Sequence, residues 1–231
     1  MPCMTNLLEL SRDSFGDDTA DLVARAIEAP REGTRLAIDA ILPAIVGAVA
    51  QRSADLAGAE RILRMLRSAS IERVGPSAGA ARLLSGPGAT ERLIGSGPGI
   101  VGALFEDRAR SLAGSLGVIG GIDAAAASRL LEIVAPLALG VFKNFLVESR
   151  VDGAGFSAIA AAQRESLQGA IDRRLLGALG FPSIAAYLDA TSAANTGARA
   201  SAPPERLRRL RPWLYLALAL LVFAALVLFM P

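Results

Sequence analysis

One segment near the end of the chain constrains this protein more than any other. From Trp213 to Met230 the sequence reads WLYLALALLVFAALVLFM, and no charged or strongly polar side chain interrupts it. As a helix these 18 residues span roughly 27 Å, close to the ~30 Å hydrocarbon core of a bilayer. A core helix of this length normally shows a polar face, and this segment shows none. The sequence therefore predicts a single C-terminal transmembrane helix over residues 212–231.

The residues that flank the apolar run predict its orientation. A basic cluster precedes the run, and two aromatic residues lie at its start. Basic flanks remain on the cytoplasmic side of a membrane, and Trp and Tyr rings prefer its interface. We therefore expect residues 1–211 to be cytoplasmic, also because residues 1–11 lack the pattern of a signal peptide. The orienting residues are Arg206, Arg208, Arg209, Arg211, Trp213 and Tyr215.

Composition divides the rest of the chain into three parts. Residues 206–211 form a basic juxtamembrane segment, and residues 191–205 are small and polar, which is typical of a flexible linker. Residues 1–190 are rich in Ala and Leu, which favour helix, and their Val and Ile residues mostly occur singly. The predicted fold is all-α: a compact multi-helix domain in front of a single transmembrane helix.

Helical periodicity predicts two long apolar helices, over residues 32–52 and 122–148, with Asp123 as the N-cap of the second. Pro43 and Pro136 lie inside them. Because proline removes a backbone donor, we expect each to act as a structural helix break that kinks or splits its helix. Repeated Gly-Pro pairs predict turns and short helices over residues 75–99. Shorter helices are expected over residues 19–29, 60–70, 100–116, 156–178 and 183–189.

The two long helices share an internal pattern. Gly47 follows Pro43 by four residues, and Gly140 follows Pro136 by four residues. Similar triplets precede the two prolines, Thr34-Arg35-Leu36 and Ser128-Arg129-Leu130. The pattern indicates two related helical halves, near residues 15–70 and 100–180 and about 93–95 residues apart. Chance similarity between two Ala- and Leu-rich helices is the alternative explanation.

Several of these motifs together resemble a known family. The motifs are Gly33-Thr34 through Pro43-Ala44-Ile45-Val46, Gly58-Ala59, Leu104-Phe105 before Glu106-Asp107, Ser128-Arg129-Leu130-Leu131 before Ala135-Pro136-Leu137, and residues 157–179. They resemble the bacterial domain of unknown function 937, the YidB-like family, over roughly residues 5–180. Two positions depart from the family pattern: Glu106 stands where glycine is expected, and Asp172-Arg173 where a proline is common. The resemblance implies an all-helical fold in a bacterial protein and implies no activity. With the predicted anchor, the expected location is the bacterial inner membrane, with the domain on its cytoplasmic side.

The composition argues against most kinds of enzyme. The chain has no histidine and one cysteine, so the commonest general base, thiolate metal clusters and most zinc sites are excluded. The net charge is +2, of which residues 205–211 contribute +3, so residues 1–204 carry about −1. A nearly neutral domain lacks the basic footprint of a nucleic-acid-binding protein. We expect no cofactor, no metal site and no catalytic residue.

Three local patterns have structural explanations. Residues 97–102 match the dinucleotide-binding pattern G-x-G-x-x-G, but no strand precedes them and Pro98 removes an amide, so we expect a turn followed by a close-packed helix. The acidic pairs Asp17-Asp18 and Glu106-Asp107 are expected to complement helix dipoles. The charged residues of the second long helix, Glu132, Lys143 and Glu148, are expected on a solvated face.

Together these features predict a non-enzymatic interaction or scaffold protein. Its partners would be the lipid bilayer and another membrane-associated protein. The alternative is a small-molecule or lipid-binding domain whose helices enclose an apolar pocket. An enzyme that uses carboxylates alone is a third reading, and it would require three or more acidic side chains in one cleft.

Overall fold

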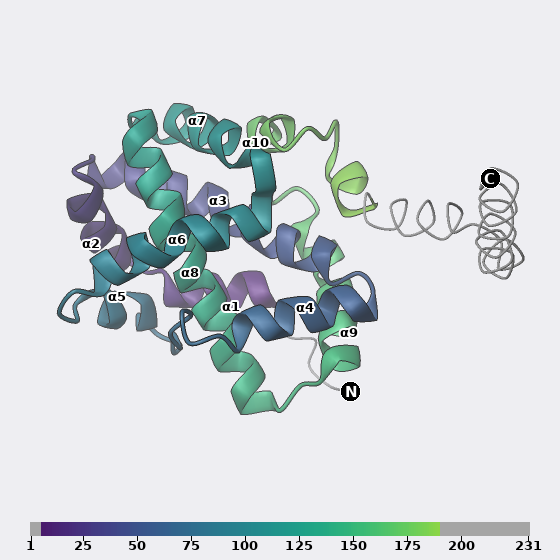
Figure 1. The fold of residues 1–231 in the computed structure, drawn as a ribbon. Coiled ribbons are helices and arrows are strands. Elements are labelled where there is room, and N and C mark those ends of the chain that lie inside the picture. The colour runs from purple at the N-terminus through teal and green to yellow at the C-terminus, as the bar shows by residue number, and fades with distance from the viewer. Residues whose placement is uncertain (1–5, 190–231) are drawn as a thin grey trace, which may run out of the picture. The chain divides into compact units, whose positions relative to one another are not determined.

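The computed structural model describes residues 6–189, all of which belong to one compact unit. The predicted linker (191–205), basic segment (206–211) and transmembrane helix (212–231) lie outside the described residues. The described part is helical and contains no strand, so the all-α prediction is confirmed for residues 6–189 (Figure 1).

Most of the helices are joined by short turns, and a longer segment, residues 67–78, connects α4 to α5. The elements are α1 Leu7–Ser14, α2 Asp17–Ile27, α3 Arg31–Arg52, α4 Leu56–Leu66, α5 Gly79–Leu84, α6 Ala89–Phe105, the 3₁₀ turn η1 Glu106–Arg108, α7 Ala109–Gly120, α8 Ala124–Ser149, α9 Gly153–Leu167 and α10 Arg173–Ala178. Residues 184–189 are also helical. Asp123 caps α8 as predicted, because its side chain accepts a hydrogen bond of 2.7 Å from the amide of Ala126.

The two long helices α3 and α8 form the centre of the core. Every residue from 41 to 50 and from 133 to 142 is buried. Pro43 and Pro136 lie within these buried stretches, yet both helices run unbroken through them. The prediction that the prolines split their helices is therefore wrong, whereas a kink at either proline stays a prediction. Each proline removes one backbone donor, and burial of the apolar side chains on both sides of it holds the helix together.

By length and composition alone, α3 and α8 could each cross a membrane. In each, however, 78% of the residues in the most apolar window are buried within the domain. Burial against neighbouring helices accounts for an apolar circumference of this kind, as it does for core helices in general.

The order of elements repeats along the chain. Helices α2, α3 and α4 are followed later by α7, α8 and α9, and α3 and α8 begin 93 residues apart, at Arg31 and Ala124. The left-handed caps that precede them, Glu28 and Gly121, are also 93 residues apart. These matching positions support the predicted halves, which stay a prediction.

The boundaries around α6 differ from the sequence expectation. Residues 75–99 include α5 and more than half of α6, which continues through Pro98. The single helix expected over residues 100–116 is instead divided at η1. The division occurs at Glu106, whose backbone has φ +55° and ψ −131°, a conformation that cannot continue a helix.

Candidate functional site

The glycine motif is part of the helix packing. Gly97, Gly99 and Gly102 all lie inside α6, so the turn expected at this point is wrong and the close-packed helix is confirmed. A Cβ atom at Gly97 would collide with the Glu132 carbonyl oxygen and lie 2.7 Å from the Glu132 Cα, whereas Gly99 and Gly102 face open space. The motif allows α6 to cross α8 closely (Figure 1) and has no geometry for a phosphate.

The acidic pairs occupy structural positions. Asp17 and Asp18 lie in the first turn of α2, where their charge complements the helix dipole. Glu106 accepts a hydrogen bond of 2.9 Å from Nη2 of Arg52, whose Nε donates to the Leu104 carbonyl at 3.0 Å. Among residues 6–189 no three acidic or cysteine side chains are grouped so that they could hold a metal ion.

Two charged residues of α8 do not lie on a simple solvated face. Glu132 is partly buried where α6 crosses, and desolvation raises the pKa of its carboxyl group, an effect that the charge of Arg129 opposes. Lys143 is also partly buried, and its Nζ donates to the carbonyls of Ser68 at 2.8 Å and Ile71 at 2.7 Å. The expectation of a solvated face is wrong for both residues.

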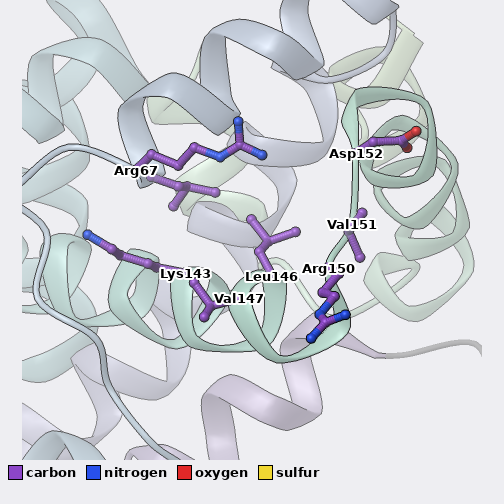
Figure 2. Close-up of a pocket in the computed structure, with 8 residues that line it drawn as sticks. Arg67, Lys143, Leu146, Val147, Arg150, Val151 and Asp152 are labelled. Atoms are coloured by element: carbon purple, nitrogen blue, oxygen red, sulfur yellow. The ribbon is translucent and has the colours of Figure 1, made fainter.

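A hollow with a net charge lies where the ends of α4 and α8 meet. Its volume is about 390 Å³. We call it the basic cleft, and Figure 2 shows its lining: Leu66 and Arg67 at the end of α4, Lys143, Leu146 and Val147 on α8, and Arg150, Val151 and Asp152 between α8 and α9.

Positive charge dominates the basic cleft. Three of its lining side chains are cationic and one is a carboxylate. That carboxylate, Asp152, caps α9 by accepting a 2.8 Å hydrogen bond from the amide of Gly155. Within residues 6–189, the side chains of Arg67 and Arg150 have no hydrogen-bond or ion-pair partner, and both residues are exposed. Two guanidinium groups are therefore available to an anion from solution.

The wall of the basic cleft is apolar. Leu66 and Leu146 are buried beneath it, and Val151 is partly buried. Val147 is 51% exposed and is one of few large apolar side chains on the described surface. In Figure 2, Arg67 extends over Leu146 while Lys143 points away from both, toward the backbone carbonyls that it binds. The cleft combines an apolar surface with cations at its edge.

A second hollow, of about 410 Å³, lies between α2 and the start of α3. Its charged lining is balanced, because Asp21 and Glu28 face Arg25 and Arg31. Arg31 also forms an ion pair with Asp21. This hollow therefore offers no net charge to a ligand.

The sequence analysis did not identify the basic cleft. Its arginines lie on segments far apart in the chain, and neither belongs to a motif. Of the residues that the sequence singles out, Lys143 lines the cleft, although it was expected only on a solvated face. Pro43 and Pro136 are in the core, and the six orienting residues lie outside the described part. An unusual local feature at the cleft is the left-handed backbone of Arg150, with φ +50°. The sequence alone gives no indication of it.

Comparison with known proteins gives one result. No curated protein and no solved structure matches this chain. A family model described as "Bacterial protein of unknown function (DUF937)" matches residues 9–144, from α1 to a point near the end of α8. The match covers more than half of the chain and ends earlier than the expected residue 180. The chain belongs to the DUF937 family of bacterial proteins.

Proposed function

We propose that this protein is a non-enzymatic interaction or scaffold domain held at the cytoplasmic face of the bacterial inner membrane by a C-terminal anchor. The observation that carries the proposal is the uninterrupted apolar run from Trp213 to Met230, which directly follows four arginines within six residues. Basic residues beside a membrane also attract anionic lipid, at about 1 kcal/mol each.

The end of the described domain supports a tether that begins late in the chain. Tyr187 is buried and inserts against Gly47 of α3, and its carbonyl accepts a 2.9 Å hydrogen bond from Gln51 Nε2. Arg164 donates to the Leu188 carbonyl and to Asp189 Oδ1, both at 2.7 Å. The domain therefore holds the chain up to the start of the predicted linker.

The linker then limits how far the domain reaches. Residues 191–205, taken as a flexible chain, have an end-to-end distance of roughly 20 Å. Confinement this close to a surface raises the effective concentration of the domain toward anything else held there. We propose that its partner is another membrane-associated protein.

Cross-linking in cells tests the proposal. The full chain and a variant that lacks residues 206–231 are expressed at equal levels, and cross-linked partners are identified by mass spectrometry. We expect membrane-associated proteins to be captured by the full chain and lost with the truncated one. Capture of the same bulk cytoplasmic proteins by both would contradict a membrane-localised scaffold.

The topology has its own test. A reporter that is active only outside the cytoplasm, fused before residue 1, is expected to stay silent, because the four arginines keep the domain inside. The same reporter fused after residue 231 is expected to be active. An active N-terminal fusion would mean that the orientation is reversed.

A second candidate is a domain that binds a lipid or small molecule. One observation favours it: the volume of the basic cleft, about 390 Å³, lies within the range of small-molecule sites. The sequence predicts such a ligand in an apolar pocket enclosed by the helices, whereas this cleft opens at the surface between α4, α8 and α9. A lipid that co-purifies with the full chain and is lost from variants of the cleft would support this candidate.

A further inference from the structure

We infer that the basic cleft binds an anionic amphiphile, with the acidic head group attracted by Arg67 and Arg150, which lie on either side of Leu146 (Figure 2), and the acyl chain lying along Val147, Leu146 and Val151. The inference rests on the second candidate function above and specifies its ligand. It is independent of the scaffold proposal.

The head-group half of the site follows from the available donors. Arg67 and Arg150 have no partner among residues 6–189, and their planar guanidinium groups match the oxygens of a phosphate or carboxylate. Lys143 already donates two of its three hydrogens to the carbonyls of Ser68 and Ile71. It therefore contributes charge to the site and ties the segment that follows α4 to α8.

The apolar half follows from the exposed wall. Val147 is 51% exposed next to two unpaired cations, and the side chains beneath it are buried leucines. An inorganic anion would leave this wall in water, whereas an acyl chain would cover it at roughly 25 cal/mol for each Å² removed from solvent. The geometry thus favours a ligand that carries both an acid and a chain.

The chain itself contains a related contact that is already filled. Asp55 and Asp152 cap α4 and α9 and stand 97 residues apart, and Arg67 and Arg164 stand the same distance apart. Arg164 binds the carboxylate of Asp189, which directly follows the buried pair Tyr187 and Leu188. The arginine at the corresponding position of the second helix therefore receives an acid attached to an apolar segment. At Arg67 that position is open to solvent.

Native mass spectrometry of the full chain, released from detergent micelles, tests the inference. The probes are lysophosphatidylglycerol, lysophosphatidylcholine with the same acyl chain, and inorganic phosphate. The variant Arg67→Ala/Arg150→Ala removes the head-group site. The control Arg12→Ala/Arg110→Ala removes the same charge from exposed positions on α1 and α7, and the arginines of residues 206–211 are unchanged in both.

We expect the wild-type chain and the control to bind lysophosphatidylglycerol equally, and the cleft variant to bind it about tenfold more weakly or worse. The substitution Val147→Asp, at an exposed position, is expected to weaken binding as well because it places a carboxylate on the apolar wall. Phosphatidylglycerol with two chains serves as a further probe. If it binds like the lysolipid, the bilayer can supply the ligand, and if only the lysolipid binds, the ligand is a free single-chain amphiphile.

Three results would overturn the inference. Equal binding by the cleft variant and the control would place the anion elsewhere. Full competition by inorganic phosphate alone would remove the role of the apolar wall. Equal binding of lysophosphatidylcholine, lost in the Val147→Asp variant, would make the cleft a lipid site without head-group selection, so the second candidate function would survive while the ligand assigned here would not. None of these results bears on the cross-linking test of the scaffold.

Discussion

Glu106 shows how a single residue can determine where a helix ends. Its φ of +55° with ψ of −131° is a conformation that glycine adopts readily and that costs other residues about 1–3 kcal/mol. Arg52 spans this turn by binding both the Leu104 carbonyl and the Glu106 carboxylate. The resemblance led us to expect glycine at this position, and the backbone angle gives a physical reason for that expectation.

The backbone strain at Glu106 predicts that a glycine variant at this position is more stable than an alanine variant, the reverse of the usual order in a helix. Glu106→Ala and Glu106→Gly both remove the ion pair with Arg52, but only Gly relieves the backbone. We expect the Gly variant to be more stable than the Ala variant by about 1–2 kcal/mol, measured by denaturant unfolding of the full chain in mild detergent. At the neighbouring Asp107, whose φ is not positive, Ala should equal or exceed Gly. An Ala variant at 106 as stable as the Gly variant would contradict the strain.

Glu132 predicts a pH dependence of stability. Its pKa is raised in the folded protein chiefly by desolvation, so between the ordinary and the raised value the folded state holds more of the proton than the unfolded state does. This group therefore costs stability as the pH rises above its ordinary value of 4.5 toward the raised value, and costs nothing below 4.5. We expect Glu132→Gln to raise the melting temperature at pH 7 and to leave it unchanged near pH 4. An equal offset at both pH values would show that the effect is not one of ionisation.

At the scale of elements, the contact between α6 and α8 depends on one glycine and one proline. Because Pro136 has no amide hydrogen, the Glu132 carbonyl in the preceding turn of α8 lacks its usual helical donor. Gly97 of α6 packs its backbone directly against that carbonyl. The proline that we expected to break α8 instead lies one turn from the point where another helix crosses it.

The glycines of α6 provide a matched test of this contact. At Gly95 a Cβ atom meets nothing within 4 Å, so Gly95→Ala should stabilise the protein by about 1 kcal/mol through helix propensity. Gly97→Ala should destabilise it by about 1–3 kcal/mol, because the added methyl group overlaps the backbone of α8. The two unfolding free energies, measured side by side, check the prediction. Similar values for both variants would show that the helices do not approach closely at Gly97.

At the scale of the whole molecule, the unit extends beyond the part that the family model matches. The match ends at residue 144, but α9 packs against α1, α3 and α4, and Phe156 and Leu167 are fully buried. The side chain of Gln163 on α9 also accepts a buried 2.8 Å hydrogen bond from the amide of Leu7 at the start of α1. The N-terminal helix α1 is therefore held in place by α9, which lies outside the residues that the family model matches.

A truncation test follows from this arrangement. A chain ending at residue 144 would expose the apolar faces of α3 and α4 that α9 covers, so we expect it to aggregate or to be digested rapidly by protease. A chain ending at residue 190 keeps every described contact and should resist digestion. Limited proteolysis followed by mass spectrometry makes the comparison. Equal resistance of the two chains would mean that α9 is dispensable for folding.

Signals that act over a few residues determined a large part of this protein. Ala- and Leu-rich periodicity specified the helical class, the Asp123 side chain specified the start of α8, and the Pro-Ala-Ile-Val and Ala-Pro-Leu motifs led to the family. The same kind of signal predicts the membrane anchor, since length and polarity alone decide whether a segment can span a bilayer.

Tertiary structure alone decided the rest. α3 and α8 continue through Pro43 and Pro136 because burial by distant helices outweighs the loss of one hydrogen bond. α6 ends at Phe105 because the backbone of Glu106 leaves the helical conformation, and Arg52 binds both the Leu104 carbonyl and the Glu106 carboxylate at that turn. The basic cleft exists because the fold brings Arg67 and Arg150 to the same hollow, and no local pattern records the proximity of segments so far apart in the chain. Local preferences determine which helices form. Burial and charge between residues far apart in the chain determine how those helices continue, where they end and which surface sites they form together.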